Sequence, residues 1–254
     1  MTASNGNKLK TLLDGHRYGA IYLAPYLEQK GISRDLQQYY CKSGWLESVG
    51  HGAFKRPKEH ISWQDGLKTL VNQSRYSIHI GGLTSLSQQG FGHYIKLGKE
   101  VVYLFSQPGR SLPSWFKNYS WGVEITHIKT SFLMDQAVLN INHENNDQIL
   151  SSPELAILEC LYLAPKKQDL LECYQVMEGL VNLRPKVLQK LLENCTSIKV
   201  KRLFFYLAEK ANHQWLKYID APNIYLGTGD RSLATNGVYV GKYKITIPTE
   251  LAAL

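Results

Sequence analysis

The stretch from Ile32 to Trp45 constrains the fold most, because its residues are spaced as in a capped amphipathic helix. Ser33 is a good N-cap residue, since its hydroxyl can accept a hydrogen bond from a free backbone amide of the first turn. Gly44 stands where a helix commonly ends, because glycine tolerates the left-handed backbone found there. The sequence therefore predicts one short helix between Ser33 and Gly44.

The side chains of this helix divide into two faces at 100° per residue. One face is predicted to pack and carries Leu36, Tyr39, Tyr40 and Ser43. The opposite face is predicted to point outward and carries Arg34, Gln37, Gln38 and Cys41, with Lys42 at its edge. A guanidinium and two amides are groups that read base edges in the major groove of DNA. We interpret the outward face as a recognition surface; the alternative is an ordinary solvated helix face.

The segments on either side complete a winged helix-turn-helix. Residues 19–30 are predicted to form a preceding helix, and the turn at residues 30–32 contains a glycine that permits a sharp reversal. Residues 46–49 and 53–56 are predicted to form strands around a glycine turn at residues 50–52. Helix, turn, helix and hairpin in this order are typical of a DNA-binding winged helix.

We expect this segment to bind DNA. Polar groups of the recognition helix would read bases, and the basic end of the wing would contact phosphates. The predicted DNA-binding residues are Ser33, Arg34, Gln37, Gln38, Lys42, His51, Lys55 and Arg56. A lone winged helix covers one half-site, and the sequence has no dimerising coiled coil. We therefore expect a monomer in solution, with two copies loading on an inverted repeat.

The charge distribution supports an anionic partner at the same segment. The 254-residue chain has a formal net charge of +8. Residues 1–60 hold nine Lys and Arg against five Asp and Glu, and the other 194 residues hold twenty against sixteen, so each part carries +4. The charge density is thus about three times higher in the winged-helix segment. Nucleic acid is the commonest partner of such a surface.

The remainder of the chain is predicted to be a second, mixed α/β domain with a helical C-terminal half. The fold class is therefore α+β, with a winged helix at residues 1–60 and a second domain at residues 61–254. Within that domain, residues 61–135 form a small α/β part and residues 150–254 form a helical part with terminal strands. The expected helices are at residues 8–14, 62–71, 83–89, 153–163, 169–181, 184–195 and 198–212. The expected strands are at residues 76–80, 100–105, 121–129, 224–226 and 238–247.

The chemistry-bearing residues form no enzyme or metal motif that we recognise. The four cysteines have no zinc-binding spacing, and we interpret them as thiols of a reducing compartment. The histidines form no His-Glu-x-x-His cluster, and His79 beside a glycine turn is more typical of a structural role than of a pair with His93. The glycine turn at residues 227–230 lacks the Lys-Ser/Thr of a phosphate loop. We expect no catalytic residue, no metal and no cofactor.

Neither a signal peptide nor an apolar run of about eighteen residues is present, so we expect a cytoplasmic protein without a membrane partner. The sequence also leaves one alternative to a regulator. This alternative is a nucleic-acid-processing enzyme that uses its winged helix only to dock on its substrate. A metal-dependent activity on DNA or RNA would favour that alternative.

Residues 44–56 resemble the wing of the AbiEi family of type IV antitoxins, which belong to abortive-infection toxin–antitoxin systems of phage defence. Other similar patches follow in the same order along nearly the whole chain, at residues 62–63, 79–86, 89–90, 93–94, 102–105, 112–116, 226–231, 237–239 and 243–248. The resemblance implies a winged helix that represses its own operon by binding inverted repeats in the promoter. It also implies a C-terminal antitoxin domain that opposes a nucleotidyltransferase-like toxin, without a stable complex between the two proteins.

A basic stripe on the last long helix is a candidate antitoxin surface. The stripe consists of Lys199, Arg202, Tyr206 and Lys210. It lies opposite an apolar face made of Val200, Leu203, Leu207 and Ala211. The functional interpretation is a surface for nucleic acid or for an acidic partner. The alternative is a solvated helix face.

Overall fold

A computed structural model describes residues 8, 10, 12, 14–91, 100–133, 141–142 and 149–254. The chain is a mixed α+β protein with two compact units. The first unit combines Met1–Ile78 with Gly109–Ile125, and the second combines His79–Pro108 with Thr126–Leu254. Of the first predicted helix, residues 8, 10, 12 and 14 are helical, and the residues between them lie outside the described part.

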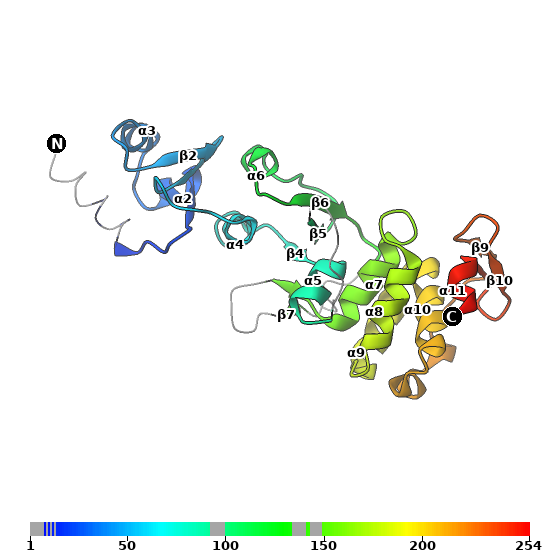
Figure 1. The fold of residues 1–254 in the computed structure, drawn as a ribbon. Helices are drawn as coiled ribbons and strands as arrows, with labels where there is room; N and C mark the ends of the chain where they lie inside the picture. The colour runs from blue at the N-terminus through cyan, green and yellow to red at the C-terminus, as the bar shows by residue number, and fades with distance from the viewer. Residues whose placement is uncertain are drawn as a thin grey trace. The chain divides into compact units, whose positions relative to one another are not determined.

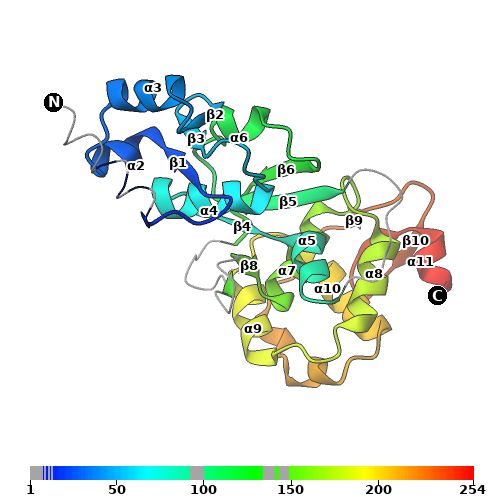
Figure 2. The same ribbon diagram turned by 60° about the vertical axis from the view of Figure 1, so that its left-hand side comes forward.

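The first unit contains the predicted winged helix (Figures 1 and 2). Its elements are β1 (Ile21–Leu23), α2 (Ala24–Gln29), α3 (Arg34–Lys42), β2 (Glu47–Gly50) and β3 (Ala53–Lys55). The three strands form an antiparallel sheet in the order β1-β3-β2. The predicted helix after the turn and the hairpin that follows it are therefore confirmed in type and order.

The prediction of one helix over residues 19–30 is wrong at its start. Ile21, Tyr22 and Leu23 are all buried and pair with β3, with Ile21 opposite Lys55 and Leu23 opposite Ala53. A short run of β-branched and aromatic residues suits a buried strand when a partner strand is available. The helix therefore begins only at Ala24, where Pro25 occupies the first turn.

The turn between α2 and α3 depends on a glycine and on a small apolar core. Gly31 has φ +79°, a left-handed conformation that residues with a Cβ rarely adopt. It lets the amide of Ile32 return to the carbonyl of Leu27 at 2.9 Å. The core under the two helices consists of Tyr22, Leu27, Ile32, Leu36, Tyr40 and Leu46. Burial of these side chains holds the two helices at the angle set by the turn.

Two later segments also pack in the first unit, which differs from the predicted division at residue 60. In α4 (Trp63–Ser74), which begins at a Ser62 capping box, Gln73 accepts from the Leu23 amide at 2.8 Å and donates to the Ile21 carbonyl at 2.7 Å. α6 (Ser114–Asn118) packs against β2, where a Cβ on Gly50 would lie 2.9 Å from Trp115. The winged helix is thus supported by residues well beyond the wing.

The second unit is built on a five-stranded sheet and a set of helices. The sheet has the order β6-β5-β4-β8-β7, with β4 parallel to β8 and β7 antiparallel to β8. The strands are β4 (Ile78–Ile80), β5 (Val101–Ser106), β6 (Glu124–Lys129), β7 (Ile141–Asn142) and β8 (Leu150–Ser151). The helices are α5 (Gly82–Gln88), α7 (Pro153–Leu163), α8 (Leu170–Gly179), α9 (Pro185–Asn194) and α10 (Ile198–Lys210). The predicted helix at residues 153–163 is confirmed at both ends.

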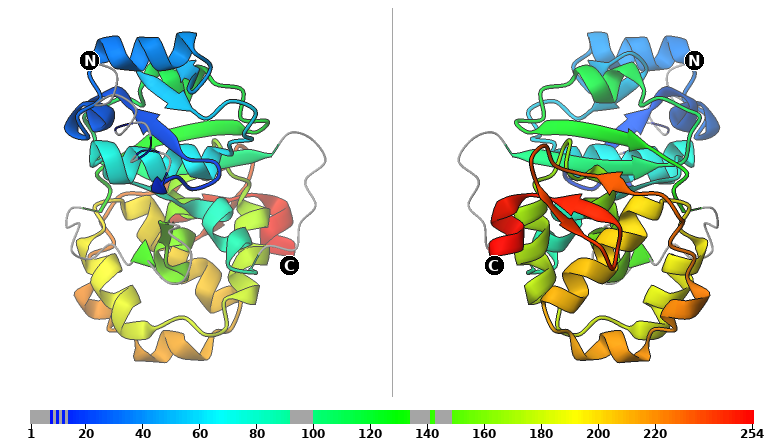
Figure 3. Two further views of the ribbon diagram at one scale, coloured as in Figure 1. Left: turned by 90° about the vertical axis from the view of Figure 1, so that its left-hand side faces the viewer. Right: turned by 90° about the vertical axis from the view of Figure 1, so that its right-hand side faces the viewer.

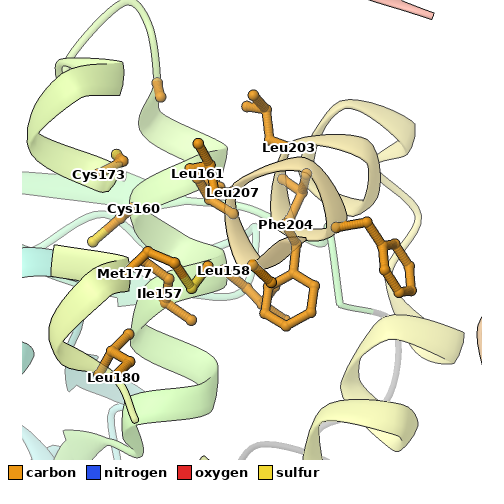
Figure 4. Close-up of a cluster of buried hydrophobic side chains, with 14 of the residues drawn as sticks. Ile157, Leu158, Cys160, Leu161, Cys173, Met177, Leu180, Leu203, Phe204 and Leu207 are labelled. Atoms are coloured by element: carbon orange, nitrogen blue, oxygen red, sulfur yellow. The ribbon is translucent and has the colours of Figure 1, made fainter. Parts of the chain in front are cut away.

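The largest apolar core lies among α7, α8 and α10. Figure 4 shows Leu158 and Leu161 of α7 on the side of Phe204 and Leu207 of α10, while Cys173 and other side chains of α8 approach α7 from its other side. Of the α7 residues, Pro153 and Tyr162 are half-buried and all the others are buried. An all-round buried helix of this kind is a central core element rather than a surface helix.

A small sheet and a short helix close the second unit. Their elements are β9 (Arg231–Ser232), β10 (Val238–Val240), β11 (Ile245–Ile247) and α11 (Thr249–Ala253), which packs against α8 (Figure 3). The predicted strand at residues 238–247 is a hairpin of β10 and β11. The predicted strand at residues 224–226 is wrong, because these residues follow a 3-10 turn at Ala221–Asn223 and pair with no strand. Among the described residues, no helix has the length and apolar character needed to span a bilayer.

Candidate DNA interface

The predicted recognition helix is capped as expected and presents one polar side to solvent. The Ser33 hydroxyl accepts a hydrogen bond from the Leu36 amide, so this predicted DNA-binding residue also fixes the start of α3. The exposed residues of the helix are Arg34, Asp35, Gln38, Tyr39 and Lys42. Three of the predicted contact residues, Arg34, Gln38 and Lys42, therefore lie together on the exposed side. They bring a guanidinium, an amide and an ammonium to one surface, which are donors for bases and phosphates.

Gln37 does not lie on this surface, and that prediction is wrong. Its side chain is 1% exposed. Its Nε2 donates to the carbonyl of Ala24 at 3.1 Å and to that of Ile32 at 2.9 Å. These carbonyls belong to the start of α2 and to the turn, so Gln37 ties the two parts of the helix-turn-helix together. Gln37 is a structural residue, because a buried polar carbonyl needs a donor.

Tyr39 differs from its prediction in the opposite sense to Gln37. It was expected to pack, but it is 60% exposed. The buried side of α3 thus includes Gln37 instead of Tyr39, while Leu36 and Tyr40 are buried as predicted. Trp45, just after the helix, is 45% exposed. Neither aromatic residue was among the predicted contacts, because a large ring in an amphipathic pattern usually indicates the buried face.

Arg34 is exposed but already paired. Its Nε donates to Glu28 Oε1 at 2.6 Å, and its Nη2 donates to Glu28 Oε2 at 3.3 Å. The side chains are 56% and 41% exposed, so water screens the pair. The hydrogen bonds that Arg34 donates to Glu28 raise the pKa of the guanidinium, which stays charged at any physiological pH. The carboxylate thus holds one edge of the guanidinium beside the N-terminus of α3.

The wing contributes less positive surface than predicted. His51 is exposed at the tip, as expected. Arg56 is 40% exposed and lies 3.8 Å from Glu59. The prediction that Lys55 is an exposed phosphate contact is wrong, because its side chain is only 8% exposed. Its Nζ donates to the Glu59 carbonyl at 2.9 Å and lies 3.2 Å from Glu47 Oε2. Its amine holds the base of the wing instead, since a buried ammonium requires acceptors.

The basic stripe on α10 is not a surface, which corrects the predicted antitoxin site. Arg202 is 1% exposed, and its guanidinium donates to the carbonyls of Leu226, Gly229 and Lys244. Lys199 is half-buried and donates to the carbonyls of Tyr162 and Ala164. Burial lowers the pKa of Lys199. Alternating charge along a helix therefore does not indicate solvent here, because backbone carbonyls of neighbouring segments take the place of water.

The other two residues of the predicted stripe are also partly covered. Tyr206 is half-buried and meets the ring of Tyr243 edge to face, with 6.3 Å between the centroids. Lys210 is half-buried, and its Nζ lies 5.7 Å from the centre of the Tyr174 ring. These contacts attach α10 to its neighbours within the second unit. The four residues therefore share a packing role rather than an open face.

The buried polar cluster around Glu159 in the second unit also makes internal contacts. His79 Nε2 lies 2.6 Å from Glu159 Oε1, and Glu159 Oε2 accepts from the Gly82 amide at 2.8 Å and from the Ser151 hydroxyl at 2.9 Å. The predicted structural role fits His79, while His93 lies outside the described residues. In the part of the chain that the structure covers, no three His, Cys, Asp or Glu side chains gather as a metal site requires. All four cysteines are described, and no disulfide joins them.

Comparisons with known proteins give matches over nearly the whole chain. Residues 5–97 match a family model described as the N-terminal domain of an AbiEi antitoxin transcriptional regulator. Residues 99–248 match a model described as a transcriptional regulator, AbiEi antitoxin, of a type IV toxin–antitoxin system. Among solved structures, the chain is similar to the RV2827C protein of Mycobacterium tuberculosis, with a TM-score of 0.64 and 14% identity over 96% of this chain and 92% of that chain. That likeness concerns the fold alone. No curated protein matches the chain.

Proposed function

The chain belongs to the AbiEi family of antitoxin transcriptional regulators of type IV toxin–antitoxin systems, and from this premise we propose that its winged helix binds inverted repeats in the promoter of its own operon. The observation that carries the proposal is the exposed side of α3, where Arg34, Gln38 and Lys42 lie together at the start, middle and end of a capped helix. Arginine and glutamine are suited to base edges, and lysine to phosphates. AbiEi proteins are antitoxin regulators rather than enzymes, so the docking-enzyme alternative loses its support.

Tyr39 and Trp45 extend the proposed contact surface. Aromatic side chains offer apolar area to thymine methyl groups and to deoxyribose. The exposure of Tyr39 in the second half of α3 and of Trp45 just after it supports a contact of this kind. His51 at the wing tip and Arg56 at its base would contact phosphates on either side of the groove. Gln37 and Lys55 are left out of the proposed surface, since both are committed to internal contacts.

Binding to the promoter is tested by fluorescence anisotropy with the DNA upstream of the gene that encodes this chain. Gln38→Ala should weaken promoter binding by roughly 1–3 kcal/mol and leave binding to random DNA unchanged, because it removes a base contact. Lys42→Ala should weaken both equally and reduce the salt slope by about 1, because it removes a phosphate contact. Lys217→Ala, an exposed lysine of the second unit, is the matched control and should change neither.

Equal affinity of the unaltered chain for promoter and random DNA would contradict the proposal. So would a normal promoter affinity in both α3 variants. Because one winged helix covers one half-site, we propose that a monomeric chain binds as two copies on each inverted repeat. Light scattering of the free protein should give the mass of one chain, and the protein–DNA complex should contain two.

We further propose that the chain counteracts a nucleotidyltransferase-like toxin without forming a stable complex with it. The proposal is supported by the match of residues 99–248 to an antitoxin of a type IV system. Co-expression with the adjacent gene should restore growth that this gene alone inhibits. A variant with weakened promoter binding, such as Lys42→Ala, should still protect the cells from the toxin when it is expressed from an independent promoter. Growth arrest that persists in the presence of the chain would contradict the proposal.

A further inference from the structure

The contact between Glu28 and Arg34 occupies only one edge of the guanidinium. A guanidinium carries five N–H donors, one on Nε and two on each Nη. Glu28 takes Nε at 2.6 Å and Nη2 at 3.3 Å, so its carboxylate covers the side edge. Within the described part of the chain, no hydrogen bond from Nη1 is found. The end of the guanidinium, made of Nη1 and the second hydrogen of Nη2, is therefore available for another pair of acceptors.

The location of this free end is where a recognition helix reads bases. Arg34 is the first residue of α3, and the N-terminal residues of a recognition helix contact base edges in the major groove. Guanine offers two acceptors there, O6 and N7, which an arginine contacts in bidentate fashion. With its side edge held by Glu28, Arg34 can meet guanine only end-on. The pair thus restricts both the orientation and the freedom of the arginine before DNA arrives, and this reduces the cost of ordering it on binding.

We propose that Glu28 is a positioning residue that sets Arg34 for end-on recognition of one guanine in each operator half-site. The proposal rests on the promoter binding proposed above. Glu28 itself contacts no base, and its negative charge repels the phosphate backbone. It therefore lowers affinity for DNA of any sequence while it raises the preference for guanine. This combination distinguishes a positioning role from a merely structural one, in which loss of Glu28 would weaken binding to every DNA.

The first step of the test finds the guanine. Dimethyl sulfate interference, which reports methylation at guanine N7, is mapped on the promoter fragment with the unaltered chain and with Arg34→Ala. We expect one guanine in each half-site to lose its interference in the variant. The second step replaces this guanine by 7-deazaguanine, which lacks the N7 acceptor. The unaltered chain should bind the replaced duplex roughly 5- to 100-fold more weakly.

The Glu28→Gln variant should lose most of this discrimination, because its amide can accept only one of the two hydrogen bonds from Arg34. Its affinity for random DNA should rise, since one negative charge near the phosphates is gone. Asp35→Asn is the matched control, because Asp35 is exposed on the same turn of α3 and makes no ion pair in the described part of the structure. It should raise affinity for random DNA in the same way and leave the 7-deazaguanine ratio unchanged.

Several results would overturn the proposal. If Glu28→Gln keeps the ratio of the unaltered chain, Glu28 does not orient the arginine. If the ratio widens in Glu28→Gln, the carboxylate withholds Arg34 from DNA. If Arg34→Ala changes the interference of no guanine while promoter binding persists, Arg34 reads no guanine and only this inference fails. Failure of the unaltered chain to prefer its promoter would instead reject the proposed operator binding.

Discussion

Arg202→Met tests whether α10 is attached to the C-terminal sheet by a buried guanidinium. The side chain is 1% exposed, with Nε 2.6 Å from the Leu226 carbonyl and Nη1 2.6 Å from the Gly229 carbonyl and 3.0 Å from that of Lys244. No carboxylate pairs with it among the described residues, so carbonyl dipoles compensate its charge. Methionine keeps most of the apolar stem and removes all three hydrogen bonds.

The expected size of the effect follows from these bonds and their surroundings. A hydrogen bond to a charged group contributes roughly 1.5–3 kcal/mol. Gly229 and Lys244 are exposed, so water can replace part of what their carbonyls lose, whereas Leu226 is half-buried and its carbonyl is less accessible. Methionine also avoids the desolvation of a guanidinium, which offsets part of the loss. We therefore expect the free energy of unfolding of the second unit to fall by about 3 kcal/mol.

Urea unfolding followed by circular dichroism measures this change, and hydrogen exchange locates it. Amides of β9 and β11 should exchange faster in Arg202→Met, because the sheet loses its attachment to α10. Lys210→Met on the same helix is the matched control and should stay within about 1 kcal/mol of the unaltered chain, since it removes only a contact with the Tyr174 ring. If Arg202→Met is as stable as the control and the amides of the sheet exchange no faster, the buried hydrogen bonds of Arg202 do not stabilise the second unit. That result would contradict the reasoning.

Two further predictions concern buried polar groups in each unit. Gln37→Leu should lower the free energy of unfolding of the first unit by about 1–3 kcal/mol, because two backbone carbonyls lose their donor; a loss of promoter affinity with unchanged urea stability would instead make Gln37 a base contact. In the second unit, burial raises the pKa of Glu154, but the hydrogen bonds from Arg184 outweigh it and leave this pKa below its usual 4.5. A carboxyl whose pKa is lower in the folded chain stabilises it above the pKa of the unfolded chain, and this stability is lost as the pH falls through the folded pKa. The urea midpoint should therefore decrease as the pH is lowered from about 5 to about 3. Arg184→Met should flatten or reverse this dependence, and an unchanged profile in that variant would contradict the role of the pair.

Local signals in the sequence were sufficient where a structure depends on neighbours in the chain. Ser33 and Ser62 cap helices as predicted, because a hydroxyl reaches an amide only three residues away. Pro153 begins a helix at the predicted residue, since its fixed φ suits the first turn. The tight glycine turn of the wing follows from the same local geometry, as does the order of helix, turn, helix and hairpin.

The orientation of the candidate site could not be obtained in the same way. The 100° spacing predicts that α3 has two faces, but polar residues stand on both, and only the tertiary structure shows which carbonyls need a donor. Gln37 is buried where its amide donates to the carbonyls of Ala24 and Ile32, whereas Tyr39 is exposed. The Glu28–Arg34 contact likewise joins two helices.

The sequence by itself therefore determined the fold class, the winged helix and the family, since these rest on short-range order and on patches of residues in a constant order. Only the tertiary structure decided which charged and polar side chains are available to a partner. The sequence pattern predicts that Arg202 and Lys55 are exposed charges. In the structure, backbone carbonyls of other segments accept their hydrogen bonds in place of water. A hydrogen-bond acceptor brought by folding leaves no trace in the periodicity of the helix or strand that it contacts, and this is why exposure could not be predicted from the pattern alone.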